Sequence, residues 1–153
     1  MKPPVPQSVV TLMIVDIARL LRKRFEIALT HVDTGLTVAE ARTLTFIWRH
    51  QGLRQAALAE RMSVEPMTLV GYLDSLETAG LIKRTVDPAD RRAKLITLTD
   101  TADPLIGKIE DAIIEVRSET LAGMSERQRD EMEAILGTMK DNLLNGEAGK
   151  CVK

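Results

Sequence analysis

The residues best suited to recognise an anion lie in a short polar segment, Asp87–Arg92, between two predicted strands at residues 82–86 and 93–98. A proline in the segment fixes one φ angle, which suits a turn, so we predict a β-hairpin with a charged tip. Asp90 and Arg92 are two positions apart, and the carboxylate could hold the guanidinium in a charge-assisted pair. An arginine held at a hairpin tip can enter the minor groove of duplex DNA. Flanking phosphates could be contacted by Lys83, Arg84, Arg91 and Lys94.

The segment before this hairpin is predicted to form a helix-turn-helix. We expect a short helix at residues 55–61 and a second at residues 65–79, which Gly80 ends. The second helix of such a pair fits the major groove of DNA. Taken separately, this helix and the charged turn are each explained by a solvated surface. Together they are typical of a DNA-binding unit. The inward stripe of the second helix is Leu69, Leu73 and Leu76, and its polar stripe is Thr68, Gly71, Tyr72 and Ser75.

Further helices are predicted on both sides of this region. The first, at residues 8–31 with Ser8 as its N-cap, is apolar on almost all sides, which indicates burial against a partner subunit. A second helix begins at Thr37, where Glu40 completes a capping box. Two more are expected after the hairpin, from Thr99 to Thr120, with a regular part from Asp103, and from Ser125 to Asn145, where fraying begins.

This order of elements predicts a mostly α-helical chain with a small β-hairpin, organised as a winged helix-turn-helix flanked by dimerisation helices. We expect one domain over residues 1–153. Within it the dimerisation helices cover 8–34 and 121–145, the winged helix-turn-helix covers 36–98, and a linking helix covers 99–120.

Charge and composition narrow the function classes. The net charge is −1, but residues 42–94 have a net charge of +3 and the rest of the chain −4, so positive charge is concentrated where DNA binding is predicted. One cysteine, no signal-peptide pattern and no apolar run of about 18 residues predict a cytoplasmic protein that does not contact membranes. His31 and His50 are isolated, and no phosphate-binding loop or nucleophile motif occurs. We therefore expect no metal, no cofactor and no enzymatic activity.

Several motifs in the middle of the chain are more specific than these patterns. The strongest are the wing segment Asp90–Lys94 and the Leu98–Thr99 pair that follows it. Together with Gln55–Arg61 and Val64–Val70, they closely resemble the MarR family, and Asp103–Ile106 further resembles its SlyA-type branch.

The resemblance, which is dense over residues 36–106, implies a homodimer with interlocking terminal helices. Such a dimer binds a pseudo-palindromic duplex operator, with the helix at 65–79 in the major groove and the wing in the minor groove. By motif position, Arg92 is the minor-groove arginine and Asp90 its orienting partner. The full set of expected DNA-binding residues is Glu65, Met67, Thr68, Tyr72, Ser75, Lys83, Arg84, Asp90, Arg91, Arg92 and Lys94.

The predicted function is sequence-specific regulation of transcription, as a repressor relieved by a small aromatic or carboxylate ligand of the kind that binds members of this family. One position departs from the pattern, because Gly71 stands where the branch often has a basic residue on the DNA face. The alternative is therefore a winged-helix protein-interaction module without specific DNA binding. Cys151 is interpreted as a thiol in the tail rather than a redox switch. Candidates for the ligand site are Arg19, Arg42 and Trp48, although each is explained as well by a core or surface position.

Overall fold

The helices of the first part of the chain end close to the predicted residues. The computed structural model describes residues 9–148, so the N-cap expected at Ser8 and the thiol of Cys151 lie outside the described residues. Helix α1 covers Val10–Thr30, and α2 covers Val38–Arg49.

A capping box begins α2, as the sequence predicts. The Thr37 hydroxyl oxygen accepts a hydrogen bond from the Glu40 backbone N–H at 3.2 Å. In return, Glu40 Oε2 accepts one from the Thr37 backbone N–H at 2.8 Å. This reciprocal pair satisfies backbone donors that the start of a helix leaves without partners, and it fixes the residue at which α2 begins.

The predicted helix-turn-helix is formed by α3, Gln55–Met62, and α4, Pro66–Thr78. Between them, Ser63 adopts a left-handed conformation with φ of 53°, which ends α3 and turns the chain. Glu65 is the N-cap of α4, and its carboxylate accepts a hydrogen bond from the Thr68 N–H at 2.9 Å. The prediction for these two helices is confirmed to within one residue at all four ends.

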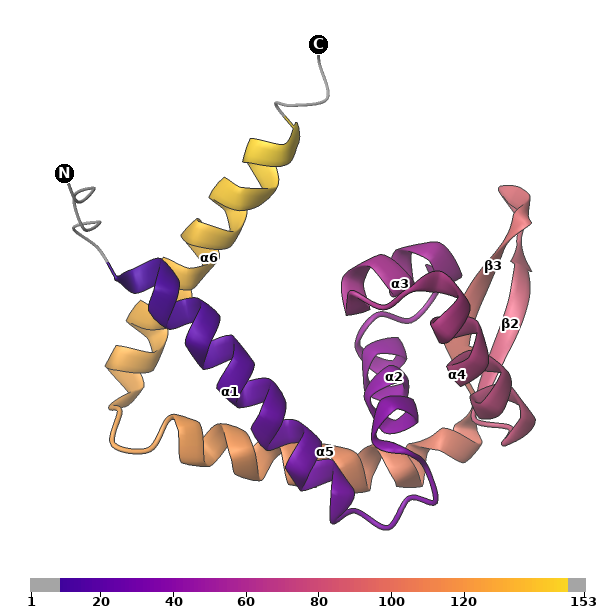
Figure 1. Ribbon diagram of the computed structural model, residues 1–153, viewed down its shortest axis with the longest axis horizontal. Helices are drawn as coiled ribbons and strands as arrows, with labels where there is room; N and C mark the ends of the chain where they lie inside the picture. Colours follow the sequence, from indigo (N-terminus) through magenta and orange to yellow (C-terminus); the bar gives the residue numbers. More distant parts are fainter. Residues whose placement is uncertain (1–8, 149–153) are drawn as a thin grey trace, which may run out of the picture. The chain divides into compact units, whose positions relative to one another are not determined.

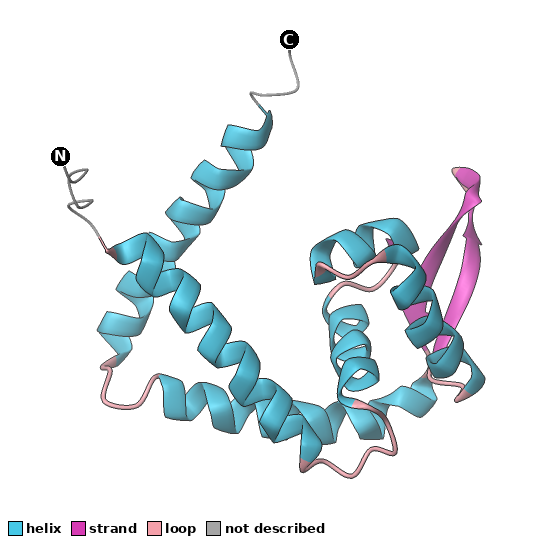
Figure 2. Cartoon of the chain, viewed as in Figure 1, coloured by secondary structure: helices cyan, strands magenta, loops and turns pink. Residues whose placement is uncertain are grey.

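The β structure is a three-stranded antiparallel sheet of order β1–β3–β2 (Figure 2). Its strands are β1, Leu53–Arg54, β2, Ile82–Asp87, and β3, Asp90–Leu98. Strand β1 was not predicted, because two residues are too few to show the alternation that marks a strand. It pairs with β3, so that Arg54 lies opposite Leu95.

The turn of the hairpin is shorter than predicted. We expected six turn residues, but β2 and β3 pair regularly as far as Val86 and Lys94, and after a register shift Asp87 pairs with Asp90, which leaves two residues between this last pair. The reason is local, since Asp87 Oδ1 accepts a hydrogen bond from the Ala89 backbone N–H at 2.8 Å and closes the turn tightly. As a result, the two strands project together beside α4 (Figure 1).

An aliphatic core joins these elements. The predicted inward stripe of α4 is confirmed, because each of its three leucines is fully buried. Removing such side chains from water is the main force that holds α4 in place, at about 1.5–3 kcal/mol each. The largest fully buried side chains are Leu44, Ile47, Leu58, Met62, Leu69, Leu73, Leu76, Ile82, Ile96 and Ile109.

The chain divides between residues 116 and 117 into two compact units. In the first unit, a short 3₁₀ helix, η1, covers Asp100–Ala102 and leads into α5, Asp103–Thr120, which starts at the predicted residue. The last turn of α5 belongs to the second unit, as does α6, Glu126–Ala148.

The start of α6 is capped as predicted, but its end is not where the sequence placed it. Ser125 Oγ accepts a hydrogen bond from the Gln128 N–H at 3.3 Å, while the Ser125 N–H donates to Gln128 Oε1 at 2.9 Å. We expected fraying from Asn145, whereas α6 continues to Ala148. The glycine in the last turn, Gly146, costs only about 1 kcal/mol relative to alanine, which is not enough by itself to end the helix.

Large apolar side chains lie on the surfaces of α1 and α6. Leu29 is the buried residue of α1, and its other large apolar residues are exposed or half-buried. The most exposed on α1 and its N-cap are Val9, Val10, Leu12, Met13, Val15, Ile17, Leu20 and Ile27, and on α6 they are Ile135, Leu136, Leu143 and Leu144. Exposed apolar surface of this kind is typical of protein–protein interfaces.

Candidate nucleic-acid interface

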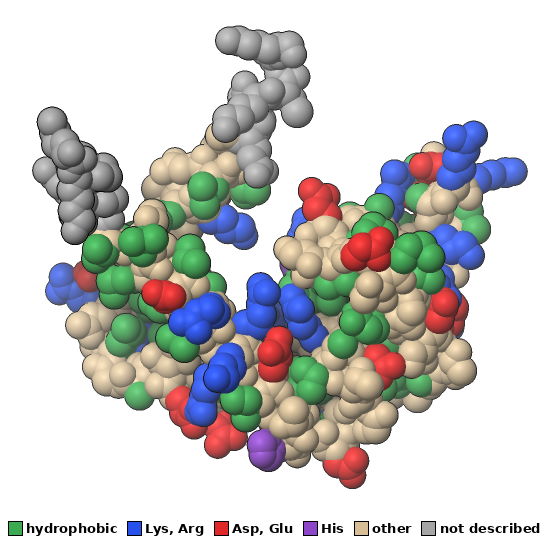
Figure 3. Space-filling model, in the orientation of Figure 1, with side chains coloured by type: hydrophobic (Ala, Val, Ile, Leu, Met, Phe, Trp, Pro, Cys, Tyr) green, Lys and Arg blue, Asp and Glu red, His purple; other side chains and the backbone are tan. Residues whose placement is uncertain are grey.

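Basic side chains gather at the outer end of the β2–β3 hairpin, which we call the wing (Figure 3). Arg91, Arg92 and Lys94 are all exposed on β3. Within the part of the chain that the structure describes, the guanidinium groups of Arg91 and Arg92 form no ion pair. They are therefore available to an external anion.

The predicted pairing of Asp90 with the Arg92 guanidinium is wrong. Asp90 Oδ1 instead accepts a hydrogen bond from the Arg92 backbone N–H at 3.0 Å. Its other oxygen, Oδ2, lies 3.8 Å from Nη1 of Arg54. Asp90 thus binds the backbone of the wing and not the side chain that it was expected to orient.

Arg54 is a wing residue that the sequence analysis missed. Its Nε and Nη2 atoms each lie 2.7 Å from Oδ2 of Asp87, whose side chain is only 10% exposed. The pKa of Asp87 lies below its ordinary value, first because the Ala89 N–H binds the carboxylate and then because Arg54 does. No signal in the sequence indicated this pair, since it joins residues 33 positions apart through the unpredicted strand β1.

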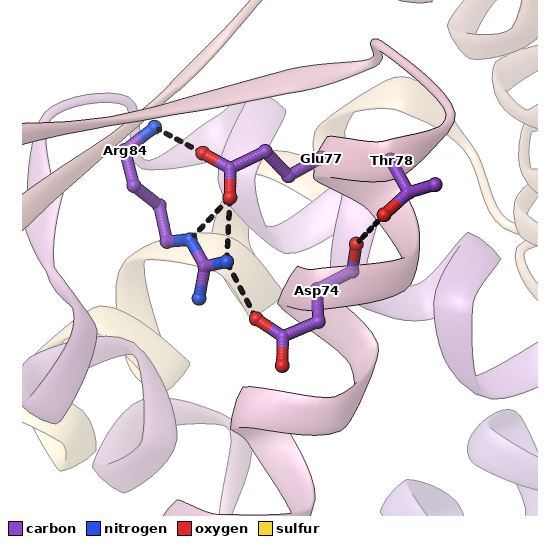
Figure 4. A network of polar contacts seen from close by, with 4 residues as sticks. All are labelled: Asp74, Glu77, Thr78 and Arg84. Atoms are coloured by element: carbon purple, nitrogen blue, oxygen red, sulfur yellow. Dashed lines mark hydrogen bonds and ion pairs between the residues drawn. The ribbon is translucent and has the colours of Figure 1, made fainter.

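Arg84 does not serve as a free phosphate contact, which corrects a further prediction. Its Nη2 atom lies 2.5 Å from both Asp74 Oδ1 and Glu77 Oε2, and its Nε donates to Glu77 Oε2 at 3.0 Å (Figure 4). The Arg84 side chain is only 16% exposed. It fastens β2 to α4, because both carboxylates belong to α4 and a buried guanidinium requires such partners.

These contacts also shift the titration of the groups involved. The hydrogen bond from Arg84 lowers the pKa of Glu77 below its ordinary value of 4.5, and the charges of Arg84 and Lys94 add to the effect. Conversely, hydrogen bonds to Glu77 and Asp74 raise the pKa of Arg84. Glu77 and Arg84 are therefore both charged at neutral pH.

Of the polar stripe predicted on α4, Thr68, Gly71 and Ser75 are exposed, but several of its groups also have partners within the protein. The backbone N–H of Thr68 is bound to Glu65, which acts as a helix cap. Tyr72 is half-buried and packs against the core. The Ser75 hydroxyl is the first cause of the lowered pKa of Glu40, which places Ser75 beside α2.

The face of α4 directly opposite its buried leucines lies beside the predicted polar stripe and shares Gly71 with it. At 3.6 residues per turn, this face contains Met67, Gly71, Asp74 and Thr78. Met67 is 72% exposed, and a Cβ atom added at Gly71 would meet nothing within 4 Å. Helix α4 contains no Lys or Arg, so positive charge beside it comes from the wing and from its neighbours.

A cleft of about 650 Å³ lies between the wing, the start of α3 and α4. It is open to solvent and lined by residues of both signs of charge. The charged residues that line it are Arg54, Glu77, Arg84, Asp90, Arg92 and Lys94.

The three candidates for a ligand site have separate partners. Arg42 donates from Nη2 to the Met62 carbonyl oxygen at 3.1 Å, which binds the end of α3. Arg19 is exposed and lies 3.4 Å from Asp16, and Trp48 packs against the core. None of these contacts brings the three together, so a ligand site made of them stays a prediction.

Among residues 9–148, no group of three or more His, Cys, Asp or Glu side chains is arranged to hold a metal ion. None of the helices in that range is both long and apolar enough to cross a membrane.

Helices α2 to α4 followed by the β2–β3 hairpin define a winged helix-turn-helix. The sequence profile of the MarR family matches residues 36–94, which include this region. The fold is also that of the crystal structure of transcriptional regulator PA3341, with 34% sequence identity, a TM-score of 0.75, and coverage of 89% of this chain and 98% of that one. The chain therefore belongs to the MarR family, as its motifs suggested.

More distant structures share the fold. A MarR-family regulator from Rhodococcus sp. RHA1 is 25% identical, with a TM-score of 0.69 and coverage of 88% of this chain and 96% of that one. The transcriptional regulator SlyA is 24% identical, with a TM-score of 0.70 and coverage of 95% and 100%. At 24% identity the likeness to SlyA shows a common fold, and membership of its branch stays a prediction.

Proposed function

We propose that this protein is a homodimeric regulator of transcription that binds duplex DNA at a pseudo-palindromic operator. The observation that carries the proposal is the pair of exposed arginines, Arg91 and Arg92, at the end of a wing whose base is fastened by ion pairs. Membership of the MarR family supports the same function.

In this proposal the wing supplies most of the positive charge that meets DNA. Arg92 enters the minor groove, while Arg91, Lys83 and Lys94 neutralise phosphates along its edges. Helix α4 enters the major groove with its outward face, where the exposed thioether of Met67 suits contact with a thymine methyl group.

The remaining parts of the proposal concern assembly and control. The exposed apolar side chains of α1 and α6 cover each other between two copies of the chain, as burial of such surface requires. The dimer represses until a small aromatic or carboxylate ligand shifts it to a state that binds DNA less well. The chain acts in the cytoplasm and has no catalytic role.

A second function is favoured by one specific observation. Helix α4 has no basic residue and contains Asp74 and Glu77, so its own charge opposes DNA. A winged helix with such a surface could instead bind a protein, and this alternative predicts no preference among duplexes.

Selection from a pool of random duplexes tests the proposal without knowledge of the operator. Repeated rounds with the purified full chain, at about 0.15 M salt, enrich a two-fold symmetric motif if the chain is a sequence-specific regulator. A pool that stays random after many rounds, from protein shown to be folded, favours the protein-interaction module.

A further inference from the structure

The buried carboxylate of Asp87 is unusual for its position. Turns of hairpins are solvated, and the neighbours Val86 and Pro88 are exposed, yet the Asp87 side chain is only 10% exposed. A charge that is removed from water in this way needs a compensating partner. The guanidinium of Arg54 provides it and covers the carboxylate from the side of β1.

Two carboxylates connect Arg54 to the backbone of the turn. Asp87 accepts from Arg54 through Oδ2 and from the Ala89 N–H through Oδ1, at 2.7 and 2.8 Å. Asp90 faces Arg54 through Oδ2 at 3.8 Å and accepts from the Arg92 N–H through Oδ1 at 3.0 Å. Each carboxylate thus contacts the guanidinium with one oxygen and binds a backbone N–H of the turn with the other, so Arg54 is linked to the conformation of the turn.

Arg54 itself is held firmly at its backbone. It pairs with Leu95 of β3 and is the residue immediately before the first turn of α3. Its side chain therefore joins the helix-turn-helix to the far part of the wing, which the backbone pairing of the two-residue strand β1 does not reach.

We propose that Arg54 is a positioning residue for DNA recognition: by clamping Asp87 and Asp90 it fixes the tip of the wing, so that Arg91 and Arg92 are presented in one orientation. This role rests on the proposed function. It replaces the direct contact between Asp90 and the Arg92 guanidinium that the motif implied.

The clamp and a direct contact of Arg54 with phosphate predict different behaviour. If Arg54 bound phosphate, its removal would lower the salt slope of DNA binding by about one, and Asp87→Asn would strengthen binding by removing a negative charge beside it. A clamp predicts instead that Arg54→Gln and Asp87→Asn both weaken binding, and that the double variant is no weaker than either single one.

The experiment uses the full chain, the variants Arg54→Gln, Asp87→Asn and the double variant, and Arg49→Gln as a matched control. Arg49 is 39% exposed against 46% for Arg54, and it also pairs with a carboxylate, that of Glu110, away from the wing. Hydrogen exchange of the Ala89 and Arg92 amides is measured in the free protein. Binding to the selected and to a scrambled duplex is measured by fluorescence anisotropy over a salt series.

We expect faster exchange of both amides in the wing variants but not in the control. Affinity for the selected duplex falls about tenfold in each wing variant, with an unchanged salt slope and little change for the scrambled duplex. Arg54→Lys keeps the charge but loses the contact of two guanidinium nitrogens with Asp87, and we expect an intermediate loss of affinity. This variant replaces Arg54→Gln in the test if Arg54→Gln does not fold.

Unchanged amide exchange in Arg54→Gln and in Arg54→Lys overturns the clamp, and so does tighter DNA binding by Asp87→Asn. If the parent chain does not distinguish the two duplexes, the proposed function fails, and the hydrogen exchange alone then decides whether Arg54 fixes the wing.

Discussion

At the scale of single residues, the basic side chains of the wing fall into two groups. Arg54 and Arg84 lie within 2.7 Å of carboxylates of the same chain, and to bind phosphate they would have to leave those partners. Arg91 and Arg92 are exposed and have no such partner among the described residues. The first pair shapes the surface, and the second pair is free to meet DNA.

Replacing Arg92 by alanine tests the contact assigned to the minor groove. We expect Arg92→Ala to weaken binding to the selected duplex by about 1–3 kcal/mol, because a desolvated guanidinium in a narrow groove is lost. The free energy of unfolding stays within about 0.5 kcal/mol of the parent, since the side chain is exposed. Anisotropy titrations and urea unfolding measure the two quantities. Equal affinity of variant and parent for this duplex contradicts the assignment.

Substitutions at Gly71 are expected to increase stability or DNA affinity, whereas Arg92→Ala lowers affinity. Because an added Cβ meets nothing within 4 Å, Gly71→Ala should raise the free energy of unfolding by about 1 kcal/mol. Gly71→Arg adds a cation on the outward face of α4, and we expect it to tighten DNA binding and raise the salt slope by about one relative to Gly71→Ala. If α4 does not face DNA, the arginine and alanine variants bind duplexes equally.

At the scale of elements, α4 is held by its core leucines, its cap and the cluster that joins it to β2. Asp74 and Glu77 hold Arg84 of β2, so the recognition helix and the wing form one connected surface. Their relative position decides whether both can meet adjacent grooves of the same duplex.

The cluster around Arg84 makes this connection dependent on pH. Since the folded pKa of Glu77 is lowered, its contribution to stability is present above the unfolded value of 4.5 and is lost as pH falls through the folded pKa. We expect Glu77→Gln to lower the free energy of unfolding by up to about 1 kcal/mol at pH 7. The difference from the parent should shrink in urea unfolding below pH 4.5, and a difference that grows there contradicts the assignment.

Glu65 was predicted to bind DNA, but its carboxylate caps α4. Glu65→Ala should therefore lower the free energy of unfolding by about 1 kcal/mol, because the Thr68 N–H loses its acceptor. Glu65→Asp, which can still cap a helix, serves as the control. Thermal unfolding of the three proteins measures the effect, and equal stability of the alanine variant and the parent rules out the cap.

Elements and site residues could be predicted to different extents, for physical reasons. Helices α2 to α4 follow from apolar periodicity and local caps, such as the Thr37–Glu40 box, which depend on residues close in sequence. Strand β1 and the roles of Arg54 and Arg84 depend on contacts between distant segments, which no local pattern encodes. The polar stripe of α4 was predicted from residue type alone, which could not show that Tyr72 packs against the core and that Ser75 lies beside Glu40 of α2.

At the scale of the whole molecule, the chain leaves two helices with large exposed apolar faces. On α1, Leu12 is 61% and Val15 67% exposed, and on α6, Leu143 is 73% exposed. A regulator that reads two half-sites needs two copies of the winged region, and we propose that these faces provide the surface that the dimer buries.

Val15→Asp tests this assembly. We expect the parent to be a dimer in light scattering coupled to size exclusion, and the variant to dissociate or to need a far higher concentration, because a charge enters an apolar interface. Val86→Asp is the matched control, since Val86 is 54% exposed on the wing and should not change the mass. A monomeric parent, or a dimer in all three proteins, contradicts the role of α1.

The central claim is that the chain binds duplex DNA with sequence selectivity through its wing. The most direct test is the affinity of the full chain for its selected duplex and for a scrambled one across roughly 50–200 mM salt. Counterion release makes the logarithm of the affinity fall roughly linearly with the logarithm of the salt concentration. We predict a preference of at least about a thousandfold for the selected duplex and a steep loss of affinity with salt. Equal, weak binding to both duplexes, or affinity that does not change with salt, contradicts the account.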